Sequence, residues 1–459
     1  MVGMGVSKCG EMAKLATRRR LLTCCHFLIS SFPLLPFLFG CGRGIADPAG
    51  TVRLSLWSMW TGAEEENFKR VLARYHELHA NIIVENLGAV RDDTKTVRAI
   101  VAGVPPDLFT LYDSLYLGPM AANEAVYALD DWFHGAGLQE KDFVEASLDQ
   151  CRYRGKLFAM PYLIDAQALF WNKRAFRRAG LDPEKPPGTL EELEKYAVAL
   201  TKHDANGNMI QLGIAPVNHK TFSAGDIYLF FKLFGGRLYD PAANRLTADD
   251  PANVTAMNWY AGLVKSMGGW RQVNAFAAGF GQAQGGNNPF FMGKTAMMIN
   301  GEWTPYWAHR YAPGLDYGVA PMPAPANRPE RARTTWFGGN MFCIPKGSKH
   351  PKEAWELLVW MQTDEAQILF AEAMNNVPNR ISALGSKKLR RGGPYKAQFA
   401  KFLDLADSPN GGAFPAVPVA NLYANEITNA LDLVLDGQKS SQFALRDVRE
   451  RVQKELGRY

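Results

Sequence analysis

Cysteine is scarce in this sequence, which limits the kinds of site that the chain can hold. Of its six cysteines, three precede Cys41, so only Cys151 and Cys343 remain in the body of the chain. Two thiols cannot build a thiol-based metal site, and we expect no metal and no cofactor. Cys151 and Cys343 either pair or stay as buried free thiols. We expect the free form, because unpaired cysteine is often buried.

The motifs of the common enzyme classes are also missing. The chain has no G-x-S-x-G nucleophile elbow, no Walker phosphate loop and no glycine-rich dinucleotide fingerprint. His76 and His79 are three residues apart, whereas the zinc helix motif needs a spacing of four, so we interpret both as surface residues. These absences favour a protein that is not an enzyme.

The body of the chain has little excess charge of either sign. The whole sequence has 51 Lys and Arg against 45 Asp and Glu, and five of the basic residues but one acidic residue precede Cys41. No basic run interleaved with aromatic residues occurs after that point. We therefore expect no nucleic-acid partner.

A long apolar run occurs at the start of the chain and nowhere else. Arg18–Arg20 precede an apolar stretch that ends at Leu38-Phe39-Gly40-Cys41, which predicts a secretory leader over residues 1–41. Leu-x-Gly-Cys resembles a bacterial lipobox, with Cys41 as the lipidation site, although Phe39 departs from the small residue usual there. The arginines also resemble a twin-arginine export signal, so the export route stays open. The alternative is an uncleaved membrane anchor.

The residues that follow alternate between strand and helix patterns. Val52–Trp57, Ile82–Val84 and Leu108–Leu111 read as strands, with helices starting near Ala63 and covering Val97–Val101. The β-α-β-α-β order predicts a mostly parallel sheet. Further helices are expected at 173–179, from a Thr189 cap, from Asp226 to an end at Gly235-Gly236, and at 352–362, 365–374, 420–435 and 443–456.

Phe290–Trp307 is the stretch with the clearest functional pattern. Thr295–Ile299 has the length of a strand and stops at the turn pair Asn300-Gly301, and Glu302, Trp303, Tyr306 and Trp307 come directly afterwards. Ligands of open α/β sheets bind at the carboxyl ends of strands, so these residues indicate a binding cleft. Alternatively, the tryptophans are core residues.

This stretch resembles the extracellular solute-binding proteins of bacterial sugar ABC transporters, of the maltose-binding-protein type. The family's "F..GK.AM...G.W" segment is matched by Phe291, Gly293-Lys294, Ala296-Met297, Gly301 and Trp303. Asp165 stands seven residues before Asn172-Lys173, as the family's acid does. The resemblance extends from Val52 to Leu456, although Leu190 replaces an aromatic residue of the family.

The resemblance implies an α/β, two-lobed periplasmic-binding-protein-like fold of type II, with the ligand cleft between the lobes. Lobe 1 is expected to contain residues 51–164 and 323–365, and lobe 2 residues 165–322 and 366–459. In this family the lobes close on the ligand by a hinge motion, and the closed form docks on a membrane permease.

The resemblance also implies the site residues. Trp303 is the expected stacking platform for a sugar ring, with Trp336 and Tyr423 as weaker candidates for the opposite side. Asp113 and Asp165 are expected to accept hydrogen bonds from sugar hydroxyls, although two carboxylates would also suit a glycosidase. Gly338 and Gly339 allow close approach of the backbone to a ligand, or form a bulge. The remaining candidates are Trp57, Ser58, Trp60, Ser114 and Arg380.

The function implied is that of an exported, lipid-anchored receptor of a carbohydrate ABC importer, placed in the periplasm or on the outer cell surface. The expected partners are a small carbohydrate, the permease subunits and the membrane, and we expect a monomer. One alternative is another polar solute such as glycerol 3-phosphate, for which Arg380 is the candidate phosphate ligand. Another is a receptor that passes its ligand to a signalling sensor.

Overall fold

The computed structural model describes residues 50–112, 114–217, 226–280, 285–391 and 393–459. The predicted leader with Cys41, and the predicted ligand residue Asp113, lie outside these ranges. Within them, no helix is both long enough and apolar enough to cross a membrane.

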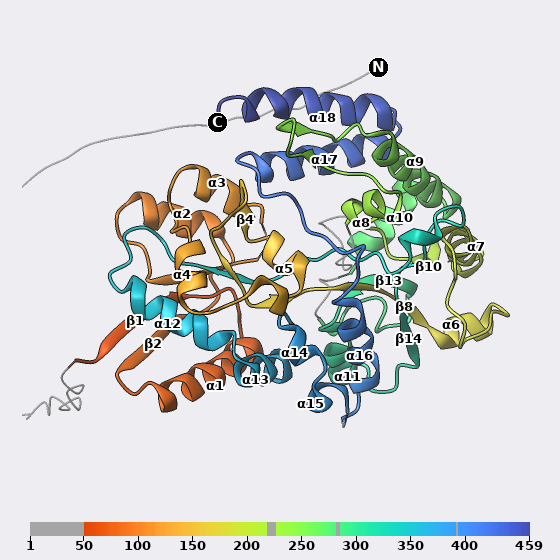
Figure 1. Cartoon of the computed structure of the whole chain (residues 1–459). Helices are drawn as coiled ribbons and strands as arrows, with labels where there is room; N and C mark the ends of the chain where they lie inside the picture. Colours follow the sequence, from red (N-terminus) through yellow and green to blue (C-terminus); the bar gives the residue numbers. More distant parts are fainter. Residues whose placement is uncertain (1–49, 113, 218–225, 281–284, 392) are drawn as a thin grey trace, which may run out of the picture. The chain divides into compact units, whose positions relative to one another are not determined.

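The first sheet is built mainly from the start of the chain. Its strand order is β2-β1-β3-β15-β6, with β1 parallel to β2 and β3, and β15 antiparallel to β3 and β6. The predicted β-α-β-α-β order is thus confirmed (Figure 1). The bounds of its strands are β1 Val52–Trp57, β2 Ile82–Leu87, β3 Leu108–Leu111, β6 Met160–Pro161 and β15 Met341–Cys343.

Helices α1, α12 and α13 cover this sheet because each has an apolar face. α1 (Ala63–Leu78) buries Phe68 and Tyr75 against the sheet, α12 spans Pro351–Met361, and α13 spans Asp364–Met374. Full burial of such a side chain contributes roughly 1.5–3 kcal/mol. Shorter helices on the same part of the chain are α2 Asp93–Val101, α3 Leu117–Ala122, α4 Asp130–Gly135 and α5 Glu145–Asp149.

The second sheet has the order β14-β8-β13-β10-β9, with β10 parallel to β13 and the other neighbours antiparallel. Every residue of β8 and β13 is buried, because separate apolar cores cover the two faces of this sheet. The bounds are β8 Gln167–Asn172, β9 Lys202–His203, β10 Met209–Ile214, β13 Thr295–Gly301 and β14 Tyr317–Ala320.

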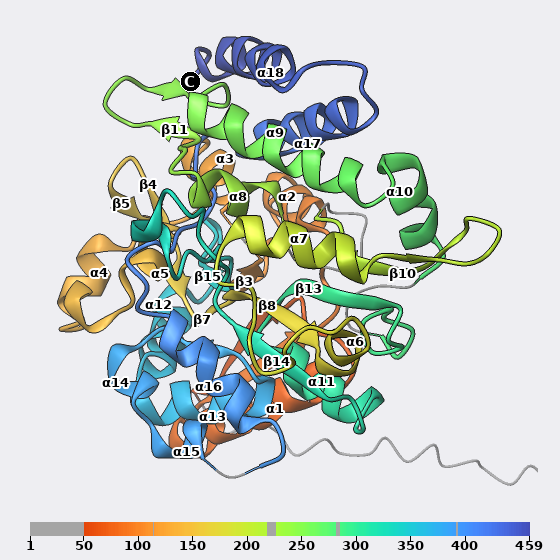
Figure 2. The ribbon, with the colours of Figure 1, turned by 90° about the vertical axis from the view of Figure 1, so that its right-hand side faces the viewer.

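Two groups of helices supply those cores. On one face lie α7, α8, α9, α17 and α18, of which α9, α17 and α18 lie side by side in Figures 1 and 2. On the other face lie α11 and α16. The bounds are α6 Lys173–Arg178, α7 Leu190–Leu200, α8 Ile227–Leu233, α9 Pro251–Ser266, α10 Trp270–Ala278, α11 Thr304–Tyr311, α14 Ile381–Leu384, α15 Lys387–Arg390, α16 Lys396–Leu405, α17 Ala420–Leu435 and α18 Ser441–Leu456.

Several local predictions are confirmed and some are corrected. The Thr189 hydroxyl accepts a hydrogen bond from Glu192 N and caps α7, as predicted, and Cys151 and Cys343 are buried free thiols. The helix predicted to begin at Asp226 and to end at Gly235-Gly236 is confirmed as α8, which ends at Leu233 ahead of a Gly235 with a φ of +83°.

The end of β13 differs from the prediction. β13 runs on through Asn300 and Gly301, and the turn comes two residues later, at Glu302 and Trp303. Residue 366, where a predicted lobe boundary falls, lies inside α13, whose Phe370 and Met374 are buried in the core of the first sheet. The predicted division into lobes stays a prediction.

Candidate functional site

Two antiparallel segments connect the sheets, and they are hydrogen-bonded to each other. The chain leaves the first sheet through Leu163–Gln167 and returns to it through Thr335–Asn340. Asp165 and Gly338 exchange both backbone hydrogen bonds, at 3.3 and 3.2 Å. Gln167 N donates to Thr335 Oγ1 at 2.9 Å, and Thr335 Oγ1 donates back to Gln167 O at 3.0 Å.

Gly338 and Gly339 occupy different environments in this crossing. Gly339 has a φ of +146°, and a Cβ placed on it would lie 2.4 Å from Leu163 O. A Cβ on Gly338 would meet nothing within 4 Å. Gly339 therefore closely approaches the backbone of the neighbouring crossing segment, whereas Gly338 faces open space. The close approach of the pair to a ligand stays a prediction.

A third segment joins the crossing after α13. Asn375 ends that helix with a φ of +57°, and β16 (Val377–Pro378) then pairs with β7 (Leu163–Ile164). This turn carries Asn376, whose buried side chain points into the crossing, where its Nδ2 donates to Asp165 Oδ1 at 3.1 Å and to Glu302 Oε1 at 2.6 Å.

Asp165 and Glu302 form a buried carboxyl pair at this junction. Their exposed fractions are 6% and 1%, and the two carboxyls are in hydrogen-bond contact. Glu302 Oε2 also accepts a hydrogen bond from Ala166 N at 3.1 Å. Burial raises the pKa of both groups, and the charge on Asp165 raises the pKa of Glu302 further.

Trp303 stands beside this pair at the start of α11. Its indole ring lies over Gly301, where an added Cβ would be 2.3 Å from the ring, so the absence of a side chain at Gly301 makes room for it. Trp303 is half-buried, and within the described ranges its buried Nε1 has no hydrogen-bond partner. A buried donor of this kind favours an acceptor from a ligand or water.

A narrow pocket separates α11 from α1. Its volume is about 10 Å³, which is room for roughly one water molecule. Glu64 lies on the α1 side, where burial raises its pKa and the positive charge of Arg91, 3.8 Å away, partly offsets this. The pocket is lined by Ala63, Glu64, Asn67, Trp303, Tyr306, Trp307, Ala373, Met374 and Asn375.

Ser114 and Trp336 meet at Phe414. The Ser114 hydroxyl donates to Phe414 O, and half-buried Trp336 packs on Tyr228 at 5.2 Å between ring centroids and on Phe414 at 6.5 Å. Tyr423 lies under the same phenylalanine but is completely buried, with its hydroxyl donating to Leu238 O at 2.9 Å. The structure therefore favours a core role for Tyr423 over contact with a ligand.

The residues predicted in the first loop are mostly packed against protein. Trp60 is 3% exposed and packs on Phe68 and Phe370, so it belongs to the core and not to a pocket wall. Ser58 is fully buried, although its hydroxyl has no partner within the described ranges. Trp57 is half-buried, with Lys95 Nζ 5.1 Å from its ring centroid.

Arg380 is separated from the carboxyl pair by its own partners. Its guanidinium lies 4.6 Å from the ring centroid of Phe143 and 3.5 Å from Asp142. Phe143 lines a larger pocket of about 760 Å³ that contains none of the predicted site residues. The carboxylates of Glu140, Glu145, Asp149 and Asp407 also line that pocket. Its size alone does not identify it as the ligand site.

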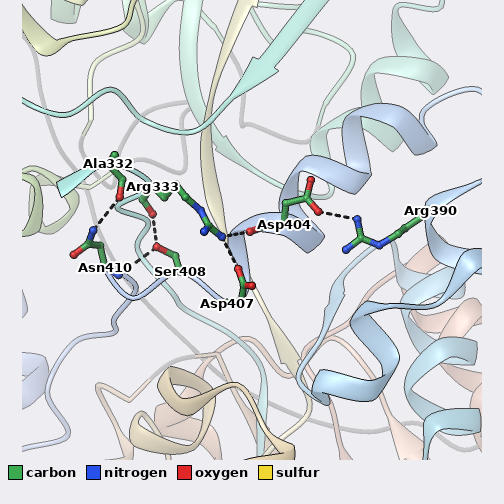
Figure 3. A network of polar contacts seen from close by, with 7 residues as sticks. All are labelled: Ala332, Arg333, Arg390, Asp404, Asp407, Ser408 and Asn410. Carbon is green, nitrogen blue, oxygen red and sulfur yellow. Dashed lines mark hydrogen bonds and ion pairs between the residues drawn. The ribbon is translucent and has the colours of Figure 1, made fainter. Parts of the chain in front are cut away.

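The returning segment is fixed to the loop after α16 by the polar network in Figure 3. Arg333 has a φ of +61°, and its guanidinium donates to Asp404 O and Asp407 Oδ1. Ser408 Oγ donates to Arg333 O at 2.6 Å, and Asn410 Nδ2 donates to Ala332 O at 2.9 Å. These contacts hold the chain just before Thr335 enters the crossing.

The sequence does not reveal the whole junction. It indicates Glu302 only as one of several cleft residues beyond a strand end, and it gives no sign that Asn376 lies there. The position of Glu302 directly after β13 could have predicted its place at the junction. Asn376 reaches the junction only because the fold brings the turn after α13 close to it, which the sequence does not indicate. Within the described ranges, no group of three or more His, Cys, Asp and Glu could hold a metal ion.

Comparisons with known proteins identify close similarity to one family. A family model for the bacterial extracellular solute-binding proteins matches residues 61–368. Maltodextrin-binding protein MdxE of Bacillus subtilis is 25% identical over 366 residues, which are 75% of this chain and 80% of that protein. The sn-glycerol-3-phosphate-binding periplasmic protein UgpB of Escherichia coli K12 is 25% identical over 255 residues, 55% of this chain and 56% of that protein.

A solved structure extends the similarity to 87% of the chain. CpMnBP1 with mannotriose bound has a TM-score of 0.76 and 28% sequence identity, and covers 87% of this chain and 99% of that chain. The predicted two-lobed α/β fold is confirmed by this likeness together with the family match.

Proposed function

Because this chain belongs to the bacterial extracellular solute-binding proteins, we propose that it captures a sugar or oligosaccharide at the crossing of its two sheets. It is an exported binding protein and not an enzyme, and its family delivers ligands to the permeases of ABC importers. The observation that carries the sugar assignment is the position of Trp303. Trp303 directly follows Glu302 and lines a pocket together with Glu64, and among the described residues its buried indole N–H has no hydrogen-bond partner.

These groups suit the chemistry of a pyranose. The C–H face of a sugar ring is apolar and slightly positive, so it packs on the negative face of an indole. Its hydroxyls donate to carboxylates, and charge-assisted hydrogen bonds of this kind contribute roughly 1.5–3 kcal/mol each. Asp165 and Trp303 come from the crossing segment and the second sheet, whereas Glu64 faces them from α1.

The narrow pocket adds a requirement for movement. A space of about 10 Å³ holds no sugar ring, so α1 and α11 must move apart for a ligand to enter. Hinge closure around a ligand is the corresponding motion in two-lobed proteins. The crossing segments at Asp165 and Gly338 are the proposed hinge.

A thermal-shift screen tests the sugar assignment. Mannobiose, mannotriose and maltodextrins are the first probes, because similar proteins bind ligands of these kinds. A ligand at 100 times its dissociation constant adds ~2.7 kcal/mol to the free energy of unfolding. If a broad panel of neutral sugars gives no shift while polyol phosphates do, the sugar assignment is wrong.

Glycerol 3-phosphate remains the second candidate, because UgpB is among the similar proteins. A phosphate site needs guanidinium groups or helix N-termini. The candidate cation Arg380 instead contacts Phe143 and Asp142, which makes the sugar the better-supported ligand.

We further propose that Cys41 is lipidated and anchors the protein, as a monomer, to the membrane. The support is the apolar run that ends at Leu38-Phe39-Gly40-Cys41. Cys41→Ser should release the protein from the membrane fraction, with Cys151→Ser as the control that stays bound. If Cys41→Ser fractionates with membranes as the parent does, the anchor proposal fails.

A further inference from the structure

The Asp165–Glu302 pair holds two acidic groups in a space with few compensating partners. Three segments converge there: the first crossing provides Asp165, the turn before α11 provides Glu302, and the turn after α13 provides Asn376. Within the described ranges, the donors are two backbone N–H groups, of Ala166 and of Glu302 itself, and the single amide nitrogen of Asn376. All three donors are neutral.

No cation compensates the pair within the described ranges. The electrostatic neighbour of Asp165 on α1 is another acid, Glu64, and the cation there, Arg91, lies 3.8 Å from Glu64. Two unpaired carboxylates in contact, away from water, repel each other and lose their hydration. One proton shared between them removes the repulsion, leaves only one buried charge and supplies the hydrogen bond that joins them.

We propose that Asp165 and Glu302 share a single proton, held mainly on Glu302, and that this makes the site take an uncharged polyhydroxy ligand and reject a phosphorylated one. The part about the ligand rests on the proposed function, because it assumes that ligand binds at this junction. The shared proton is a property of the empty protein.

The shared proton gives the pair both a donor and an acceptor. A sugar hydroxyl also donates and accepts, so it can bind to the pair in either direction. A phosphate group carries at least one negative charge at neutral pH and offers mainly acceptors, so the remaining negative charge of the pair and Glu64 both repel it. Burial and the mutual charge raise the pKa of both acids, in agreement with a retained proton.

Infrared spectroscopy of the empty protein tests the proton directly. At neutral pH, exposed carboxyls are ionised, and a buried protonated carboxyl gives a separate C=O stretching band. The spectrum of the parent minus that of Glu302→Gln should contain this band. The matched control is Glu365→Gln on α13, which removes an exposed carboxylate paired with Arg74 at 2.7 Å and should leave the band unchanged.

A second variant keeps the test valid if Glu302→Gln does not fold. Asp165→Asn keeps the size of the side chain and removes the negative charge that helps to hold the proton, so the band should titrate at lower pH than in the parent. A parent spectrum without the band at neutral pH, or a band that both variants leave intact, overturns the shared proton.

The ligand class is tested separately with mannotriose and glycerol 3-phosphate in thermal-shift measurements. Stabilisation by mannotriose alone supports the proposal. Stabilisation by glycerol 3-phosphate overturns the rejection of phosphate, whatever the infrared result. If neither ligand stabilises the protein, the result agrees with phosphate rejection but counts against sugar capture, and the infrared spectrum still decides on the proton.

Discussion

Trp303 is held in place by the backbone in front of it. Its ring occupies the space over Gly301 that any other side chain would fill, and it is half-buried beside α1. This arrangement leaves part of the indole available to a ligand, unlike Trp60, which is enclosed by Phe68 and Phe370. Trp60 shows that a tryptophan after a strand can belong to the core, whereas the partial exposure of Trp303 agrees with the proposed ligand site.

Trp303→Ala should weaken sugar binding by tenfold or more, or about 1.4 kcal/mol, because the stacking surface is lost. Most of the ligand-induced change in tryptophan fluorescence should disappear with it. The matched control is Trp259→Phe on α9, which packs on Phe230 and should keep the fluorescence response. Unchanged affinity in a folded Trp303→Ala protein would remove Trp303 from the site.

Asp165 is proposed to bind the ligand, and it also holds the junction together through Asn376 and Glu302. Asp165→Asn should weaken sugar binding by about tenfold, because a charged acceptor is replaced by a neutral one. Asp165→Ala should in addition destabilise the empty protein by roughly 1–3 kcal/mol, since it leaves Asn376 and Glu302 short of a partner. Calorimetric titration and urea unfolding of both variants measure the two effects.

The sequence alone leads to a different expectation for Asp165. A carboxylate that only binds ligand hydroxyls could be removed with little effect on the stability of the empty protein. The contacts to Asn376 and Glu302 change that expectation. Normal binding by a stable Asp165→Ala protein would exclude Asp165 from both roles.

The packing of the two crossing segments requires their backbones to approach each other closely at Gly339. Gly339 lies against Leu163 O, at the point where the return segment meets the outgoing one. Its φ of +146° is a conformation that side chains rarely adopt, and a Cβ would meet a carbonyl oxygen that cannot move without shifting β7. Of the two neighbouring glycines, only Gly339 therefore lies where the backbone requires glycine.

Gly339→Ala should therefore lower the free energy of unfolding by at least about 1–3 kcal/mol. Gly338→Ala is the matched control, because a Cβ there meets nothing within 4 Å, and it should change stability by less than about 0.5 kcal/mol. Urea unfolding of the two variants under the same conditions makes the comparison. Equal effects would show that the approach to Leu163 is not restrictive.

Across the whole molecule, the sequence predicts those features that depend on residues close together in the chain. Alternating apolar residues predicted β1, and the Thr189 cap predicted the start of α7, because both depend on neighbours in sequence. The family resemblance located Asp165 and Trp303. The enclosure of Trp60 and Tyr423 was not predictable, since their packing partners, such as Phe370 and Leu238, are far away in the chain.

The buried carboxyl pair also needed the fold to be recognised. Nothing near Asp165 in the sequence indicates that Glu302 will touch it, and nothing near Glu302 indicates that Asn376 will donate to both. Protonation depends on such long-range contacts, because desolvation and neighbouring charge decide it. The protonation of this pair should therefore affect how the stability of the entire protein depends on pH.

The free energy of unfolding should rise with pH in the acid range and fall with pH in the neutral range. Burial alone would raise the pKa of Asp107, but hydrogen bonds from Ser55, Ser348 and His350 N lower it overall. This carboxylate stabilises the protein above its unfolded pKa of ~3.9, and the contribution is lost as the pH falls through its lower folded pKa. In the acid range, the protein should therefore lose stability as the pH falls, as most proteins do.

Above pH ~4 the Asp165–Glu302 pair should reverse the slope. The pKa of each group is raised by burial, so the native protein keeps protons that the unfolded chain releases above pH ~4. Since the native state then binds more protons, the free energy of unfolding falls as pH rises, until the raised pKa values are passed. The slope is at most about 1.4 kcal/mol per pH unit for each proton. Urea unfolding across the neutral range should show this fall in the parent and in Glu365→Gln, and a flatter profile in Glu302→Gln. Identical profiles in all three proteins would mean that the proton is not bound at the junction, even though the two carboxyls meet there.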